Sequence, residues 1–136
     1  MVKMSIVYEG NLRCQLTHAP SGSHIQTDAP VDNMGKGEAF SPTDLVAAAL
    51  SSCMLTVMGI VAQRNQIDLI GTEVAVEKEM VTQPIRRIGK ISVVFKMAKG
   101  IDHAKREMLE RAAHTCPVHK SLHPDVETPI TFQYPD

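Results

Sequence analysis

Two cysteines lie in sequence contexts that suit redox chemistry. Cys53 sits in a run without charged residues, and Cys116 is followed directly by Pro117. Proline favours the first helical position, so Cys116 is expected at an N-cap, where backbone N–H groups and the helix dipole stabilise a thiolate. Such a pair can reduce a peroxide, because one thiol becomes a sulfenic acid and the other condenses with it to a disulfide. In the plainer interpretation Cys53 is a small core residue and Cys116 a turn residue without a role.

A second group of residues around Cys116 could bind a metal ion. His114, His119 and His123 lie close to it in the sequence, and the C-x2-H-x3-H spacing is one that zinc accepts. Pro117 interrupts this group, and no second cysteine pair completes a structural zinc site. A zinc-binding module is therefore the third-ranked interpretation, and we expect no metal and no other cofactor.

A few charged residues are candidates to assist a reactive thiol. Arg13 precedes Cys14 on an expected strand, Arg86 and Arg87 are adjacent in an expected connection, and Glu38 lies in an expected loop. A nearby charge shifts the pKa of a thiol, and a guanidinium can hold a peroxide oxygen. The default interpretation of each is a solvated surface charge.

The first forty residues predict strands followed by a loop. Alternating or β-rich segments over 4–9, 12–17 and 24–27, separated by turn signals, predict an antiparallel meander. Residues 28–40 contain two glycines and a proline without hydrophobic periodicity, and predict a loop long enough to have a functional role.

A long helix is predicted over residues 42–63, ending near Asn65. Ser41, Pro42 and Asp44 supply an N-cap hydroxyl, a proline at the first helical position and an acid three residues after the cap, which is a capping box with Asp replacing Glu or Gln. Residues 45–62 carry no charge and approach the minimum length of a membrane span. Their small and hydroxyl side chains instead favour a helix buried on nearly all sides, most simply at a subunit interface.

The second half of the chain predicts a hairpin, two helices and a last strand. The hairpin strands are expected over 73–81 and 88–97, joined through Pro84 and Gly89. An amphipathic helix over 102–115, a short helix from Pro117 to residue 122 and a strand over 129–134 follow. This order of elements predicts a single α+β domain over residues 1–136.

The composition is that of a soluble globular protein. Of 136 residues, 43% are hydrophobic and 21% charged, with a formal net charge of −1. The balanced charge removes the electrostatic basis for binding nucleic acid or an anionic membrane, and two Tyr, three Phe and no Trp are too few for a base-stacking platform. An odd count of three cysteines and an N-terminus without a signal-peptide pattern favour a reducing, cytoplasmic location.

Two motifs taken together resemble the OsmC/Ohr family, the osmotically inducible and organic-hydroperoxide-resistance proteins. The first motif, over residues 40–53, is FSPTDLVAAALSSC, and the second, over residues 113–118, is AHTCPV. The resemblance covers nearly the whole chain, including the order of elements. It implies an intertwined homodimer in which antiparallel sheets wrap two long central helices, and this would explain the uncharged helix.

The resemblance also implies a cysteine-based thiol peroxidase without metal or flavin. Carried over by position, Cys53 would be the peroxidatic thiol and Cys116 the resolving thiol, joined as a Cys53–Cys116 disulfide after oxidation. Arg13 is the best candidate for the activating Arg that the family carries on an N-terminal strand. The substrates would be organic or fatty-acid hydroperoxides, and the reductant a dithiol such as a lipoylated protein.

One position departs from the hydroperoxide-resistance branch of the family. That branch has a Glu directly after the proline of the helix start, where this chain has Thr43. A carboxylate can hold an Arg by a bidentate pair and a hydroxyl cannot, so we expect Arg13 to be less firmly held unless Glu38 fills the role. The alternative to a peroxidase is a non-catalytic dimer that uses its thiols for ligand binding or redox sensing.

Overall fold

The structure, a computed structural model, describes residues 1–135 and forms two compact units. The first comprises residues 1–46 and the second begins at residue 47. Each unit has its own antiparallel strand pairing, and helices occur mainly in the second unit. The α+β fold class predicted from the sequence is confirmed, and the single domain over residues 1–136 stays a prediction.

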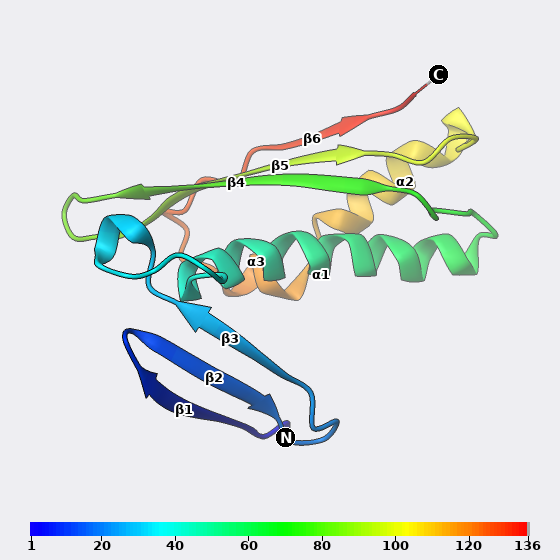
Figure 1. The fold of residues 1–136 in the computed structure, drawn as a ribbon. Coiled ribbons are helices and arrows are strands. Elements are labelled where there is room, and N and C mark those ends of the chain that lie inside the picture. The colour runs from blue at the N-terminus through cyan, green and yellow to red at the C-terminus, as the bar shows by residue number, and fades with distance from the viewer. Residues whose placement is uncertain (136) are drawn as a thin grey trace. The chain divides into compact units, whose positions relative to one another are not determined.

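The first unit begins with the predicted meander. Strands β1 (Met4–Gly10), β2 (Arg13–His18) and β3 (His24–Asp28) pair antiparallel in that order (Figure 1). The sheet has one apolar and one polar face, because side chains alternate along a strand. The register shows this in two cross-strand rows, Ile6–Leu16–Ile25 on one face and Val7–Gln15–Gln26 on the other.

Burial in the first unit is unusual, because its buried residues are polar. Thr27, Asp28 and Ser41 are buried, while the apolar side chains of Ile6 and Tyr8 on β1 stay more than half exposed. An apolar sheet face of this kind, left open by its own chain, is typical of a surface that another element or subunit covers.

The loop after β3 is closed on itself. It contains a single turn of 3₁₀-helix, η1 (Val31–Asn33). Gly35 packs so tightly against Ala29 that a Cβ there would collide with the Ala29 carbonyl group. The loop also returns to its starting point, because the Asp28 N–H donates to the Phe40 carbonyl at 3.1 Å. The predicted loop is therefore present, and its two ends meet at Asp28.

Helix α1 (Pro42–Arg64) begins at the predicted capping box. The Asp44 N–H donates to Ser41 Oγ at 3.0 Å, and the Ser41 N–H donates to Asp44 Oδ2 at 2.9 Å. These two reciprocal bonds satisfy donors that a helix start otherwise leaves unpaired. The capping box is confirmed, with Asp in the position usually taken by Glu or Gln.

Only one stripe of α1 is fully buried within a single chain. Leu50, Met54, Met58 and Ala62 recur at intervals of four residues and are at most 2% exposed, whereas Ile60 is 46% exposed. By length and composition α1 could also cross a membrane, with a mean hydropathy of 2.2, a property that core helices of soluble proteins share. The predicted burial on nearly all sides is therefore not reached by one chain alone.

The sheet of the second unit has the order β4-β5-β6. Strands β4 (Glu73–Val81) and β5 (Arg87–Lys96) form the predicted antiparallel hairpin, and β6 (Ile130–Gln133) runs parallel to β5. The sheet is therefore mixed, a detail that the expectation of antiparallel sheets did not include. Gly89 was expected in the connection of the hairpin, but it lies inside β5. There it packs against the Val81 side chain of the paired strand.

The remaining helices complete the core of the second unit. Helix α2 (His103–Ala113) begins at the N-cap Asp102, and α3 (Pro117–Ser121) begins at the N-cap Cys116. Figure 1 shows α1 and α2 on the same side of the β4-β5-β6 sheet. Most of the fully buried side chains of the second unit come from α1, β5 and α2, and include Leu50, Met54, Met58, Ile91, Val93, Phe95 and Leu109.

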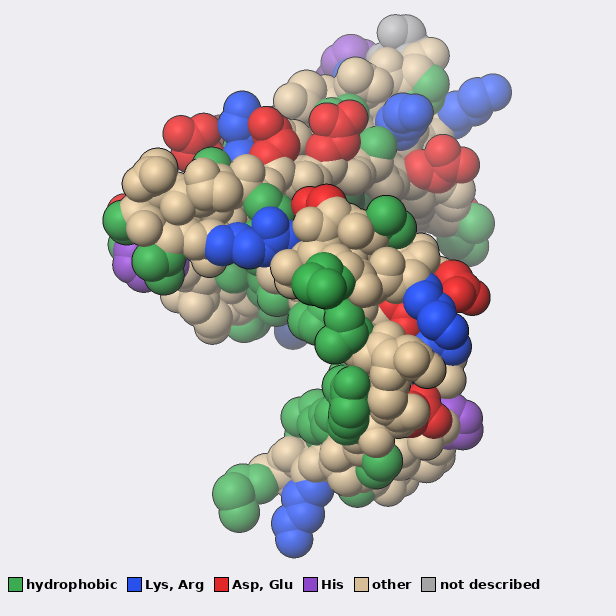
Figure 2. All heavy atoms as spheres, turned by 60° about the vertical axis from the view of Figure 1, so that its left-hand side comes forward, with side chains coloured by type: hydrophobic (Ala, Val, Ile, Leu, Met, Phe, Trp, Pro, Cys, Tyr) green, Lys and Arg blue, Asp and Glu red, His purple; other side chains and the backbone are tan. Residues whose placement is uncertain are grey.

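Charged side chains of both signs are mixed on the surface. Figure 2 shows Lys and Arg interspersed with Asp and Glu on the face that it draws, in keeping with the formal net charge of −1. Some of these charges form pairs, such as Lys90 with Glu79 at 3.7 Å and Arg111 with Glu107 at 3.1 Å. These exposed pairs contribute little to stability, so the apolar core carries most of it.

The capping box predicts a measurable contribution to stability. Ser41→Ala removes the hydroxyl that accepts from the Asp44 N–H, and should lower the free energy of unfolding by about 1 kcal/mol. Gln63→Ala on an exposed position of the same helix is the control, and should leave stability equal or slightly higher because alanine has the higher helix propensity. Chemical denaturation measures both, and equal losses for the two variants would contradict the assigned cap.

Candidate active site

Cys53 lies in the middle of α1, where the sequence supplies a long uninterrupted helix. Its side chain is half-buried, whereas Leu50 and Met54 beside it are fully buried. Leu50 and Cys53 are three residues apart and therefore share a helix face. The Cys53 sulfur is thus placed at the margin of the core, where a solute can still reach it.

Cys116 occupies the predicted N-cap of α3 and is fully buried. Its sulfur accepts a hydrogen bond from the His119 N–H at 3.5 Å, and its thiol donates to the Leu50 carbonyl at 3.9 Å. Pro117 occupies the first helical position and has no N–H that needs a partner. The Cys116 sulfur therefore contacts the next turn of α3 and helix α1. The short helix therefore holds Cys116 against the turn of α1 that precedes Cys53.

The two thiols meet. Cys53 and Cys116 are both free and their side chains are neighbours, although 62 residues separate them in the chain. Burial raises the pKa of the Cys116 thiol, and the neighbouring Cys53 side chain raises it further. The N–H groups of His119 and Val118 act in the opposite direction and do not outweigh these effects. The expectation that the N-cap makes Cys116 a thiolate is therefore wrong, since desolvation dominates and the group stays protonated.

This arrangement suits the oxidation of one thiol followed by its condensation with the other. A half-buried thiol at Cys53 can meet a solute, while the protonated thiol of Cys116 is shielded from solvent. Because the two thiols are neighbours, their sulfurs can be joined by an S–S bond of about 2.05 Å. The pair can therefore form an intramolecular disulfide once one sulfur is oxidised.

Arg13 and Glu38 are also brought together, within the first unit. Arg13 Nε and Nη2 lie 2.7 and 2.8 Å from the two carboxylate oxygens of Asp28, and Arg13 Nη2 lies 3.9 Å from Glu38 Oε2. Asp28 is 1% exposed and also accepts the Glu38 N–H at 3.0 Å. The hydrogen bonds from Arg13 lower the pKa of the Asp28 carboxyl, and burial opposes them without reversing the shift.

The expectation that Arg13 is loosely held is therefore wrong. Thr43 bonds to Ser41 at the helix start, with 3.1 Å between the two hydroxyl oxygens, and it is Asp28 that provides the bidentate carboxylate for Arg13. Asp28 was not predicted from the sequence. The signal was present only indirectly, because Asp28 ends β3 and faces Arg13 once the register of β2 and β3 is known.

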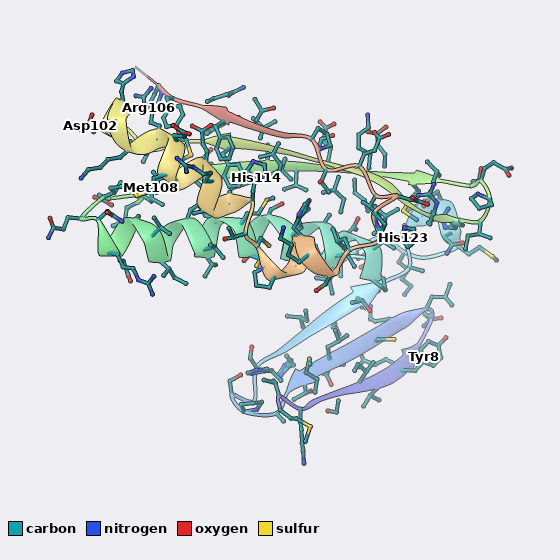
Figure 3. The ribbon with its side chains drawn as sticks, turned by 180° about the vertical axis from the view of Figure 1, so that it is seen from behind. Tyr8, Asp102, Arg106, Met108, His114 and His123 are labelled. Carbon is teal, nitrogen blue, oxygen red and sulfur yellow. The ribbon has the colours of Figure 1, made fainter. Side chains whose placement is uncertain are left out.

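The histidines near Cys116 do not assemble into a metal site. Within residues 1–135 there is no group of three or more His, Cys, Asp or Glu side chains that could hold a metal ion. His114 packs edge-on against Phe132, and Figure 3 shows it far from His123, which pairs with Asp125 at 3.7 Å. The zinc interpretation therefore lacks the convergent ligands that it needs.

Comparisons with known proteins identify a matching family and similar structures. A family profile described as OsmC, OsmC-like protein, matches residues 35–131. The chain is 43% identical to a candidate osmotic stress induced and detoxification response protein from Psychrobacter arcticus, with a TM-score of 0.92, 98% of this chain and 96% of that chain covered. A comparison with curated proteins gives no match.

More distant solved structures share the fold. An organic hydroperoxide resistance protein OsmC from Legionella pneumophila is 18% identical with a TM-score of 0.77, covering 98% of this chain and 96% of that chain. The organic hydroperoxide resistance protein OhrB of Bacillus subtilis is 19% identical with a TM-score of 0.69, covering 98% of both chains. At these identities the likeness concerns the fold.

The buried carboxylate of Asp28 predicts an acid-dependent stability. Because the pKa of Asp28 is lower in the folded than in the unfolded protein, its contribution is present above the ordinary value of 3.8 and is lost as pH falls through the folded value. Asp28→Asn should therefore lower the free energy of unfolding at neutral pH and flatten its fall below about pH 4.

Denaturation measured from pH 7 to pH 3 tests this, with Glu73→Gln as an exposed acid-to-amide control. The control should keep the wild-type pH dependence. If Asp28→Asn also kept it, the ion pair with Arg13 would not be what stabilises the first unit.

Proposed function

The chain belongs to the OsmC/Ohr family, and from this membership we propose that it is a thiol peroxidase that reduces organic hydroperoxides. The observation that carries the proposal is the pairing of Cys53 with Cys116, one half-buried and one fully buried. Relatives with the same fold are named organic hydroperoxide resistance proteins, which supports a redox role for such a pair.

In the first step the Cys53 thiolate attacks the terminal oxygen of the hydroperoxide. The O–O bond breaks, the alcohol leaves after taking up a proton, and Cys53 becomes a sulfenic acid. The sulfur is oxidised by two electrons and the peroxide is reduced by two. The half-buried position of Cys53 supports this assignment, because the attacking sulfur must reach the substrate while Cys116 is shielded.

In the second step the Cys116 sulfur attacks the Cys53 sulfenic sulfur. The S–S bond forms as the S–O bond breaks, and the hydroxyl leaves as water with the proton of Cys116. The raised pKa of Cys116 supports this role, because the thiol keeps that proton until its neighbour is oxidised. An external dithiol, such as a lipoylated protein, then restores both thiols by exchange in a reducing cytoplasm.

Arg13 and Glu38 are proposed as the charged residues of the peroxide site. The bidentate bond to Asp28 supports the role of Arg13, because it holds the guanidinium in one orientation and keeps it charged. Glu38 is joined to the same group through its N–H bond to Asp28. Asp28 is thus added as the residue that positions Arg13.

A homodimer is proposed as the assembly, as members of the family generally are homodimers. Two features support it. Within the described residues of the first unit no hydrophobic side chain is buried, and its apolar sheet face carries Ile6, Leu16 and Ile25. In the second unit, α1 has an apolar groove of about 420 Å³ that includes Ser52, Leu55 and Val74. A second copy is the simplest cover for both surfaces.

The peroxidase proposal predicts a defined disulfide. A small excess of cumene hydroperoxide should convert the protein to one intramolecular Cys53–Cys116 bridge, with Cys14 still free, as peptide mapping can show. Cys116→Ser should accumulate the Cys53 sulfenic acid, because no thiol resolves it. Cys14→Ser is the matched control and should behave as wild type.

Turnover separates the peroxidase from a binding or sensing dimer. With a dithiol reductant present, the wild-type protein should consume hydroperoxide through many cycles, and Cys53→Ser should consume none. A single oxidation without turnover would favour the sensing alternative, and a bridge that contained Cys14 would contradict the assigned pair.

The dimer proposal predicts different effects for two neighbouring residues of β1. Ile6 and Val7 are both 59% exposed in one chain, but Ile6 lies on the apolar face and Val7 on the polar face. Ile6→Lys should raise the dimer dissociation constant at least about tenfold, because it places a charge in the interface, whereas Val7→Lys should not.

Light scattering at micromolar concentration measures both variants against the wild type, whose chain mass is 14.9 kDa. Circular dichroism confirms that each variant is folded. A wild-type monomer, or equal behaviour of the two variants, would contradict the assignment of this face.

A further inference from the structure

Helix α3 is a short element that is anchored at one end. It has no buried residue of its own, and the buried residue at its start is its N-cap Cys116. The Cys116 sulfur accepts from the His119 N–H and is placed next to the Leu50 carbonyl of α1. Where this sulfur lies relative to Cys53 therefore depends on what holds α3 in place.

The backbone bonds of α3 and the turn after it are local. The Lys120 N–H donates to the Cys116 carbonyl at 3.1 Å, and the Leu122 N–H to the His119 carbonyl at 3.3 Å. A side-chain bond reaches further, because His119 Nε2 lies 2.9 Å from Thr128 Oγ1. This bond ties α3 to the segment that leads into β6.

Thr128 lies in a backbone segment that is hydrogen-bonded to the sheet. The Glu127 N–H donates to the Gly89 carbonyl at 3.0 Å, and the Glu127 carbonyl accepts from the Ile91 N–H at 2.8 Å. On the other side of Thr128, the Pro129 carbonyl accepts from the Val93 N–H at 2.9 Å. Both neighbours of Thr128 are thus bonded to β5, so its hydroxyl is a rigid point of attachment.

His119 therefore joins the sulfur to the sheet, with its N–H on Cys116 and its ring on Thr128. Its other ring nitrogen, Nδ1, is buried and has no hydrogen-bond partner among the described residues. A buried polar atom without a partner is unfavourable and calls for an explanation. The position of the His119 ring is explained if the bond between Nε2 and Thr128 determines it. Nδ1 is then left without a partner as a consequence.

We propose that Thr128 is a positioning residue for disulfide formation, holding Cys116 in line with Cys53 through His119. The proposal rests on the proposed peroxidase function and concerns its second step. In that step the Cys116 sulfur must approach the Cys53 sulfur opposite the departing hydroxyl, which leaves as water with the Cys116 proton. The first step involves Cys53 and the hydroperoxide, and does not use α3.

The test compares two variants of Thr128 with a control in α3. Thr128→Val keeps the shape and removes the hydroxyl, and Thr128→Ser keeps the hydroxyl. Ser121→Ala removes a hydroxyl that donates to Pro117 within α3, at 2.9 Å, and does not tie α3 to the sheet. All are made in the full chain with Cys14→Ser, and each is checked to be folded by circular dichroism.

The two steps are timed separately with cumene hydroperoxide. Sulfenic acid formation is trapped with dimedone in a Cys116→Ser background, and disulfide formation is followed by rapid quench with Cys116 present. Thr128→Val should leave the first rate unchanged and slow the second about five- to tenfold, the effect of losing one hydrogen bond. Thr128→Ser and Ser121→Ala should keep both rates of the parent protein.

An unchanged second rate in Thr128→Val, or equal slowing of both steps, overturns the proposal. If cumene hydroperoxide oxidises Cys53 in no variant, the peroxidase function fails, and the positioning role is judged with diamide instead. Diamide oxidises the two thiols directly, because its N=N bond takes up their two electrons and two protons. Closure should again be about five- to tenfold slower in Thr128→Val than in Ser121→Ala, and equal rates overturn the proposal.

Discussion

The buried sulfur of Cys116 is the contact on which the arrangement of the site depends. It caps α3, lies against the Leu50 carbonyl of α1 and neighbours the Cys53 thiol. Burial raises the pKa of this thiol and so favours its protonated, less nucleophilic form, which suits the resolving role proposed for it. The fold thereby separates an accessible thiol from a shielded one while holding both sulfurs within reach.

The two units of the chain bury different kinds of side chains. The second unit buries an apolar core drawn from α1, β5 and α2, and this core fixes the turn of α1 that carries Cys53. The first unit buries the carboxylate of Asp28 instead, and a buried charge is tolerated only when it is paired and hydrogen-bonded. Arg13 and the Glu38 N–H supply those bonds, so one carboxylate orders both a strand and the loop before α1.

The exposed apolar surfaces follow from the same division. With its buried positions occupied by polar groups, the first unit leaves the Ile6 face of its sheet open. Helix α1 likewise buries one stripe and has no charged residue from Leu45 to Gln63 to face solvent on its other sides. Surfaces of this kind mark sites that another element or subunit covers, and members of this family are generally homodimers.

Much of the local structure could be predicted from the sequence, and the contacts that make the site could not. The Ser41–Asp44 capping box, the N-cap position of Cys116 and the bounds of most strands depend on neighbours within a few residues, and these were predicted correctly. Glycine and proline likewise predict turns from neighbouring residues alone. Gly89 was assigned to the hairpin connection but lies in a strand, because a glycine inside a strand gives the same pattern as a turn. The family resemblance supplied the pairing of Cys53 with Cys116, since periodicity alone left it open.

Other features were decided only by tertiary structure. The pairing of Arg13 with Asp28 depends on the register of β2 and β3. The parallel direction of β6 depends on how the chain returns to the sheet. The bond between His119 and Thr128 depends on how the segment before β6 pairs with β5. The protonation of Cys116 was also reversed, because an N-cap favours the thiolate locally whereas desolvation by surrounding elements favours the thiol. Local patterns determine which element a residue joins, but the packing of distant elements determines what surrounds its side chain, and that environment sets its chemistry.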